Sequence, residues 1–293
     1  MLQETLLLEV LDARHVRKDA AYLAEKIAVQ IARIGPENLA SITTDGASSC
    51  LAAQNLLRNS PEFALAGRTA LLRCVEHMGN LIAGDVIAGI PWVQKLTQDV
   101  HKASRMLRKH KRMHALVRQR LEEAAAAKEL QAYRRIRIIR RTRFCSVHAM
   151  LQAHLSNRLV LQRISGDAAW KDIYNGNSEK KKQRLARMEK TFTKVPCWAR
   201  AERAEKVLRP VSLFTRKVAG GDFAVCVPAW MELKKTLQET LAAVDFVDRV
   251  SDESRQDVDL RKTRISEKLL QREARRFRVC GFEHCIRWLS FHR

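Results

Sequence analysis

The sequence predicts an α/β layer that is followed by a mainly α-helical region and a basic tail. Over the first 90 residues, short aliphatic runs alternate with stretches whose apolar residues recur at helical spacing. From Trp92 onward the pattern is helical, and the net charge changes from −2 over residues 1–100 to +24 over residues 101–293. We therefore expect an α/β domain over residues 1–91, a basic helical region over 92–249 and a charged tail over 250–293, either a solvated helix or a disordered arm.

Three short aliphatic runs are the expected strands of the α/β layer. They cover residues 5–12, 39–44 and 69–75, and polar residues bound each of them. Because helices separate the runs in the sequence, the strands should form a largely parallel sheet that is covered by helices. A sheet of three strands is narrow and has exposed edges, so the layer is incomplete unless another element covers it.

Helices are expected between and after these strands. The first covers residues 17–34 and ends at Gly35, the second begins at Ser48 or Ser49, either of which can cap it, and the third covers residues 77–90. Further helices are predicted at residues 92–120, 121–141, 142–165, 199–208 and 229–249. The tryptophans are expected to anchor the core of the helical segments rather than to stack on bases: Trp92, Trp170, Trp198, Trp230 and Trp288.

Positive charge is concentrated at the start of the helical region. Residues 101–143 hold 15 basic and 3 acidic side chains. A basic block beside a nearly neutral one predicts a polyanion partner, most often nucleic acid, whereas the alternative is a solvated charged face without a partner. The candidate phosphate-binding residues are Lys102, Arg105, Arg108, Lys109, Lys111, Arg112, Arg140, Arg141 and Arg143.

Cysteine usage and hydropathy predict an intracellular protein. The seven cysteines are odd in number and scattered, which is typical of reduced thiols rather than of a disulfide framework. No run of about 18 apolar residues is present, so we expect neither a membrane-spanning helix nor a membrane partner. The first residues lack the basic segment and cleavage site of a secretory signal. A nuclear or other intracellular location is therefore expected.

Asp45, Cys74 and His77 are the candidate site residues of the α/β layer. Asp45 follows a predicted strand, and ligands of open α/β sheets bind at the carboxyl ends of strands. A carboxylate there can hold a divalent cation, or it can simply stabilise the N-terminus of the next helix. Cys74 and His77 are three positions apart at the next strand–helix junction, which fits either half of a zinc site or a packed, hydrogen-bonded pair.

Three short motifs occur in order along the chain: Thr-Asp-Gly-Ala-Ser at residues 44–48, Cys-x-x-His at residues 74–77 and Thr-Arg-Phe at residues 142–144. In order and spacing they resemble the core region of hAT-superfamily transposases, and more narrowly the transposase-associated domain of unknown function 659. The resemblance covers residues 4–165 and continues faintly over residues 166–245.

The resemblance implies a ribonuclease-H-like fold that is interrupted by a helical insertion. It makes Asp45 the second acid of an Asp-Asp-Glu triad that binds two Mg²⁺ or Mn²⁺ ions for DNA strand transfer, and it places Cys74 and His77 beside that site. The family's first Asp lies on a strand upstream of a segment like residues 5–12, and no Ser-Glu-Arg-like motif supplies the Glu. The substitutes that match no motif are Asp12, Asp85 and Glu232.

We therefore expect a catalytically inactive relic of a hAT-type transposase, truncated at both ends, that keeps non-specific, salt-dependent binding to DNA and holds no cofactor. One carboxylate of a triad cannot support two-metal catalysis. Three alternatives stay open. The chain could be an active metal-dependent nuclease or transposase with unrecognised acids, a protein-interaction module such as a homo-oligomer, or a chain with no stable fold. Metal-dependent cleavage would favour the first alternative, and oligomer formation without nucleic-acid affinity would favour the second.

Overall fold

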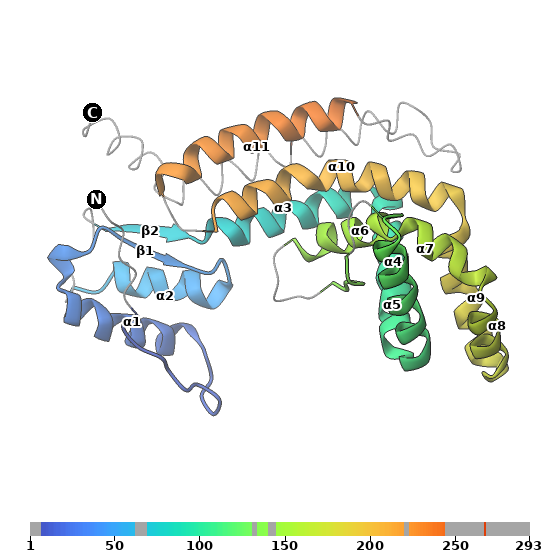
Figure 1. Cartoon of the computed structure of the whole chain (residues 1–293). Helices are drawn as coiled ribbons and strands as arrows, with labels where there is room; N and C mark the ends of the chain where they lie inside the picture. Colours follow the sequence, from blue (N-terminus) through green and yellow to red (C-terminus); the bar gives the residue numbers. More distant parts are fainter. Residues whose placement is uncertain are drawn as a thin grey trace. The chain divides into compact units, whose positions relative to one another are not determined.

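The computed structural model describes residues 7–61, 69–130, 134–139, 145–219, 223–243 and 267. These residues are mainly helical, with two short parallel strands (Figure 1). They divide between Met78 and Gly79 into two compact units, here called the α/β unit and the helical unit. The division falls inside α3 (Val75–Gly89), whereas the sequence predicted a boundary after residue 91.

The α/β unit follows the predicted alternation of helices and strands. Its elements are α1 (Ala20–Ile34), a 3-10 turn (Pro36–Asn38), β1 (Ser41–Thr44), α2 (Ser48–Arg58) and β2 (Ala70–Arg73). The carboxylate of Asp19 caps α1 by accepting a hydrogen bond from the Tyr22 N–H. The helix ends at Gly35, whose φ of 88° is a conformation that suits glycine, so the predicted stop is confirmed.

The two strands pair in parallel and in register, with Thr44 opposite Arg73. α1 and α2 pack against each other, and Leu39 and Ile42 pack against the small cluster that they bury, which contains Ala24, Ile31, Ala53 and Leu57. The buried side chain of Gln54 in α2 donates a hydrogen bond of 2.9 Å to the Leu72 carbonyl. This bond ties the connecting helix to β2, so β1, α2 and β2 form one βαβ unit.

Two predictions for this unit are wrong. Residues 7–12 of the expected first strand are irregular, and the side chains of Leu7 and Val10 are 77% and 80% exposed. An aliphatic run gains stability as a strand only when it pairs with a neighbour, and these residues have none among the described ones. Neither Ser48 nor Ser49 caps α2, because Ala47 occupies the N-cap position and no side chain makes the capping hydrogen bond.

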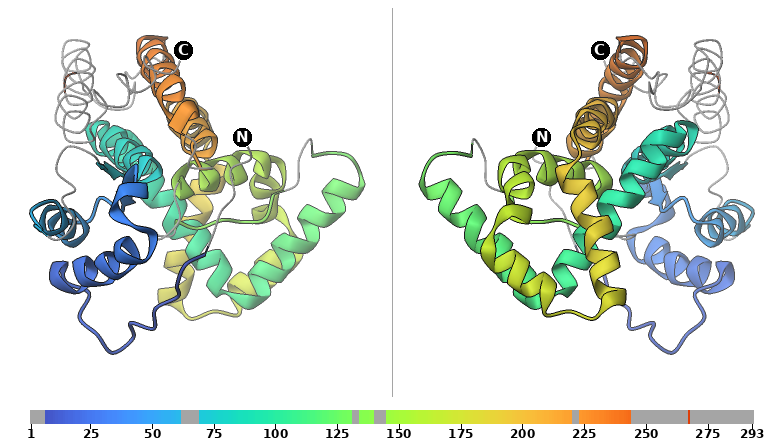
Figure 2. Two further views of the ribbon diagram at one scale, coloured as in Figure 1. Left: turned by 90° about the vertical axis from the view of Figure 1, so that its left-hand side faces the viewer. Right: turned by 90° about the vertical axis from the view of Figure 1, so that its right-hand side faces the viewer.

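The helical unit continues from α3 through eight further helices in the described part of the chain. They are α4 (Pro91–Lys109), α5 (Lys111–Ala126), α6 (Ser146–Ser156), α7 (Arg158–Arg163), α8 (Ala168–Asn175), α9 (Glu179–Thr193), α10 (Val195–Lys217) and α11 (Phe223–Ala243), with a 3-10 turn (Ile164–Gly166) after α7. The predicted helix over residues 92–120 is broken at His110, whose ring accepts the Met113 N–H and caps α5. α4 and α5 therefore meet at an angle (Figure 2).

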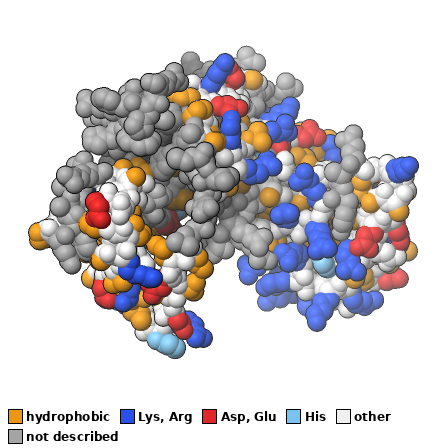
Figure 3. All heavy atoms as spheres, turned by 60° about the vertical axis from the view of Figure 1, so that its left-hand side comes forward, with side chains coloured by type: hydrophobic (Ala, Val, Ile, Leu, Met, Phe, Trp, Pro, Cys, Tyr) orange, Lys and Arg blue, Asp and Glu red, His pale blue; other side chains and the backbone are white. Residues whose placement is uncertain are grey.

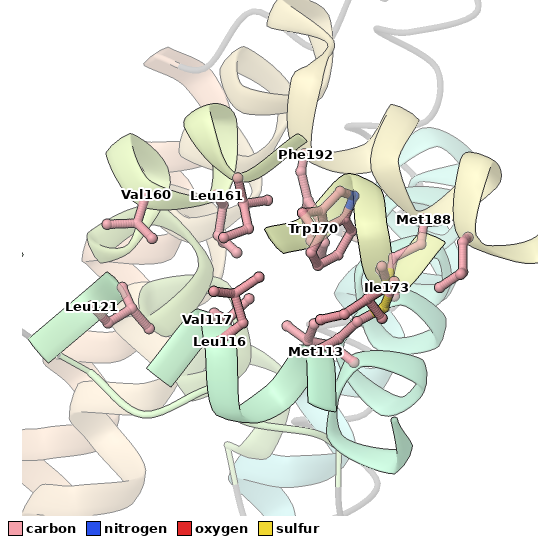
Figure 4. Packing of buried hydrophobic residues seen from close by; sticks show 14 of the residues in the cluster. Met113, Leu116, Val117, Leu121, Val160, Leu161, Trp170, Ile173, Met188 and Phe192 are labelled. Atoms are coloured by element: carbon pink, nitrogen blue, oxygen red, sulfur yellow. The ribbon is translucent and has the colours of Figure 1, made fainter. Parts of the chain in front are cut away.

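The main core of the helical unit lies among α4, α5, α7, α8, α9 and the start of α10 (Figure 4). Trp170 and Trp198 are 1% and 0% exposed within it, and Trp92 is 8% exposed. The prediction that tryptophans anchor the core is confirmed for these three. Trp230 is partly exposed and Trp288 lies outside the described residues.

α6 and α10 are joined by a buried polar network. The Nε2 of His148 lies 2.9 Å from Oε1 of Glu205, and both side chains are almost fully buried. Arg209 donates to both carboxylate oxygens of Glu205, at 3.0 and 2.6 Å. Burial opposes ionisation of Glu205, but these hydrogen bonds outweigh it and lower the pKa of Glu205 to about 2.

The helix predicted over residues 121–141 is wrong beyond Ala126. Lys128 adopts a left-handed φ of 57° and ends the helix, and residues 134–139 are not helical. Two side chains hold this segment in place. The buried Asn157 accepts the Arg134 N–H and donates to the Arg134 carbonyl, while Nδ1 of His101 accepts the Ile139 N–H at 3.1 Å.

Candidate functional site

The ends of β1 and β2 bring two of the predicted site residues into contact. Asp45 follows β1, His77 lies in the first turn of α3, and Oδ1 of Asp45 is 2.9 Å from Nδ1 of His77. The hydrogen bonding between the two strands explains the contact, because the Cys74 N–H donates to the Thr44 carbonyl at 2.8 Å and so aligns the two strand ends. Gly46 leaves room for the imidazole, since a Cβ there would lie 2.8 Å from Cδ2 of His77.

The residues at this contact do not fit the metal pair that the resemblance implies. Mg²⁺ prefers a nearly octahedral set of oxygen ligands, and two-metal catalysis needs several converging carboxylates. Asp45 contacts an imidazole instead, and the described part of the chain contains no group of three or more His, Cys, Asp and Glu placed to hold a metal ion. Of the substitute acids, Asp12 pairs with Arg14 and Glu232 pairs with Lys217.

Cys74 is partly buried and forms no disulfide, and none of the other described cysteines forms one: Cys50, Cys145, Cys197 and Cys226. The Asp45–His77 pair therefore orders the junction between the strand ends and α3, and it assembles no triad among the described residues. Asp85, the third substitute acid, belongs to α3.

The described candidate phosphate-binding residues lie on the outer surface of α4 and α5. All six are exposed, and none forms an ion pair with another described residue: Lys102, Arg105, Arg108, Lys109, Lys111 and Arg112. The opposite face of α4 is buried, with Val100 and Leu107 both 0% exposed. This amphipathic pattern directs the basic side chains to solvent. Arg140, Arg141 and Arg143 lie outside the described residues.

Charge on this surface comes from lysine and arginine rather than from histidine. Burial, together with the charge of Arg105, lowers the pKa of His101. Burial and the charges of Arg108 and Arg118 lower the pKa of His114 in the same way. Both imidazoles are therefore mainly neutral at pH 7, chiefly because they are partly buried and secondarily because guanidinium groups lie nearby.

A basic groove, with a volume of about 790 Å³, runs between α4 and α9 to the start of α10. The basic side chains that line it come from all three helices and from the residue that joins α9 to α10: Lys95, Lys102, Arg184, Arg187, Lys190, Lys194 and Arg200. Asp99 is the acidic residue among the described lining residues. Figure 3 shows Lys and Arg side chains gathered over the helical unit.

Of the seven basic residues that line the groove, only Lys102 was predicted from the sequence to bind phosphate. The other six were missed because the groove depends on the packing of α9 against α4, which are far apart in the chain. A signal was present nonetheless: Arg184, Arg187 and Lys190 recur at intervals of three residues, so they follow one side of a helix.

No family model matches the chain, and no curated protein or solved structure matches it. Function is therefore inferred from geometry and charge. Among the described residues, no helix is long and apolar enough to cross a membrane.

Proposed function

We propose that this chain binds nucleic acid through phosphate contacts made by the helical unit, without reading base sequence and without cutting the strand. The observation that carries the proposal is the set of six exposed cations on α4 and α5 that form no ion pair with a described residue. Exposed, unneutralised Lys and Arg side chains on one surface are the electrostatic footprint of a polyanion partner.

The Asp45–His77 contact supports a second part of the proposal, in which the α/β unit is a remnant of a ribonuclease-H-like layer of a hAT-type transposase. Two motif residues that the resemblance places side by side lie 2.9 Å apart. A remnant with a single acid of the triad should not cleave DNA in Mg²⁺ or Mn²⁺. Metal-dependent cleavage that is lost in Asp45→Ala would overturn this part.

Phosphate contacts make binding depend on salt. Each neutralised phosphate releases counterions, so the logarithm of the binding constant falls by roughly 0.9 per contact and per tenfold rise in salt for a duplex, and by roughly 0.7 for a single strand. Four to six contacts thus predict a steep loss of affinity between about 50 and 200 mM salt.

The test is fluorescence anisotropy of labelled oligonucleotides, titrated with the full chain at several salt concentrations. One variant replaces four surface cations outside the groove by alanine: Arg105, Arg108, Lys109 and Lys111. We expect its affinity at low salt to fall at least tenfold, and its salt slope to fall by about one for each phosphate that the variant no longer neutralises.

A matched control removes the same charge from the α/β unit by replacing four exposed cations by alanine: Arg17, Lys18, Arg33 and Arg58. The control should retain the slope and most of the affinity. An affinity that stays flat from low to physiological salt, or an equal loss in both variants, would remove the proposal.

A further inference from the structure

We infer that the groove between α4 and α9 binds a single-stranded segment of nucleic acid, with the phosphates against its two basic walls and the bases toward its apolar floor. The inference rests on the proposed function and names the form of nucleic acid that this site takes.

Cations face the groove from both sides. Lys95 and Lys102 on α4 are seven positions apart, two helical turns along one side of the helix. Arg184 and Arg187 on α9 form the opposing wall, and Lys194 marks the end of the groove near α10. A chain lying along the groove can therefore have cations on either side of it for most of its length.

The shape of the groove favours a single strand over a duplex. α4 packs directly against α9, so the groove is a depression along the seam between two touching helices and not a gap that separates them. A duplex is stiff over many base pairs, so it would contact only the rim of such a depression and would leave the inner cations without phosphates. The groove's volume of about 790 Å³ falls within the range of about 300–1,000 Å³ that encloses small ligands, which suits a few nucleotides.

The groove floor is apolar, which suits bases but does not distinguish among them. It is formed by Trp92, Leu96, Ala103, Met106 and Met188. The Arg203 guanidinium lies 5.1 Å above the ring centre of Trp92, and that ring is only 8% exposed. The floor therefore offers van der Waals contact rather than an open stacking platform. We expect weak base preference and an affinity dominated by salt-dependent phosphate contacts.

Two side chains provide direct probes of occupancy. Asp99 is the acidic residue among the described lining residues, so it opposes a bound phosphate. Cys197 lines the same groove as a partly buried free thiol, and an occupant there should shield it from alkylation. Burial raises the pKa of Cys197, so the alkylation is best run at mildly alkaline pH.

The first experiment reverses charge on one helix at two pairs of sites. Arg184→Glu with Arg187→Glu changes the groove wall, while Lys180→Glu with Lys181→Glu changes exposed residues of α9 that do not line the groove. Affinity for a labelled oligothymidylate of about 20 nucleotides should fall at least tenfold in the groove variant and less than threefold in the control. Asp99→Asn should bind it more tightly than wild type. Far-UV circular dichroism checks that each variant is folded.

The second experiment follows iodoacetamide labelling of Cys197 by peptide mass spectrometry. Saturating oligothymidylate should slow labelling of Cys197 at least fivefold and leave Cys145, which does not line the groove, unchanged. A duplex of the same length should protect Cys197 less.

Three outcomes would overturn the inference. The first two are equal affinities of the two charge-reversal variants and unslowed labelling of Cys197 at saturation. If the alanine variant of α4 and α5 still loses binding in either case, the proposed function stands and only the groove is excluded. The third is stronger protection of Cys197 by duplex than by single strand. A wild-type chain that binds no oligonucleotide would overturn both proposals together.

Discussion

Lowering the pH from 7 to 5 should destabilise the protein through His154, and His154→Phe should remove this part of the loss. His154 is 3% exposed in α6, and its ring stacks on Trp198 with centroids 4.3 Å apart and 13° between the planes. Its Nε2 makes no hydrogen bond to any residue in the described part of the chain. Burial disfavours the charged form, which lowers the pKa of His154 to about 3.

The size and sign of the effect follow from linkage. The folded pKa lies below the ordinary value of 6.5, so the unfolded chain takes up the proton first as the pH falls. The stability that depends on neutral His154 is complete above pH 6.5 and is lost progressively between pH 6.5 and 3. At pH 5 the loss is about 1.5 pH units at 1.36 kcal/mol per unit, or roughly 2 kcal/mol.

Urea unfolding at pH 7, 6 and 5, followed by tryptophan fluorescence, measures this directly. The described tryptophans all lie in the helical unit, as His154 does, so the signal reports the relevant unfolding. We expect the free energy of unfolding to fall about 2 kcal/mol further in wild type than in His154→Phe between pH 7 and 5. His15→Gln, at an exposed histidine, should follow wild type. Parallel losses in wild type and His154→Phe would refute the reasoning.

Three further predictions concern other side-chain contacts. The pKa of Glu205 is about 2, so wild type should lose stability relative to Glu205→Gln as the pH falls from about 5 to 2; a constant difference in urea midpoints would contradict this. Gly46→Ala should cost about 1–3 kcal/mol by crowding His77, and adding His77→Ala should recover most of that cost. Thermal unfolding tests the pair, and fully additive changes would exclude the clash. Asn157→Ala removes both hydrogen bonds to the Arg134 backbone, so trypsin should cut within residues 134–139 faster than in wild type. Equal cleavage rates would show that these two hydrogen bonds do not hold the segment in place.

Local signals were sufficient to predict the existence and order of α1, β1, α2 and β2. Gly35 ends α1 as predicted, through a positive φ, whereas the Asp19 cap begins the helix at Ala20 and not at the expected residue 17. The strands β1 and β2 each contain only four residues, yet both were predicted, because turns and helical segments bound these aliphatic runs in the sequence. The run over residues 5–12 is also aliphatic, but its described residues 7–12 pair with no described strand, and pairing is not encoded in a single run.

Helix propensity misled the prediction after α5. The alanine-rich start of residues 121–141 is helical only to Ala126, where a left-handed Lys128 ends the helix without glycine. Arginine and isoleucine alternate over residues 135–138, a two-residue period that argues against a helix. The segment is held instead by two side chains that are distant in the sequence: Asn157, between α6 and α7, and His101 in α4. Propensity is thus overridden by tertiary hydrogen bonds.

The candidate sites show the same division between local and distant information. Asp45 and His77 were identified from motifs at neighbouring strand ends, and parallel pairing is enough to bring such ends together. The groove needed the knowledge that α9 lies against α4, which no local pattern supplies. In the sequence, the α9 wall shows only as the three-residue spacing of Arg184, Arg187 and Lys190.

The distribution of acidic side chains distinguishes the proposed phosphate-binding surface from the rest of the charged surface. Near the end of α5, cations are compensated: Arg118 pairs with Glu122, and Arg120 pairs with both Glu123 and Asp167. By contrast, the six cations on α4 and on the first turn of α5 have no acidic partner among the described residues. Like charges left together repel and destabilise a fold, and interspersed acids relieve that repulsion. The cations near the end of α5 are therefore neutralised within the protein, whereas those on α4 and the start of α5 are not. Such uncompensated positive charge suits the phosphates of a bound nucleic acid.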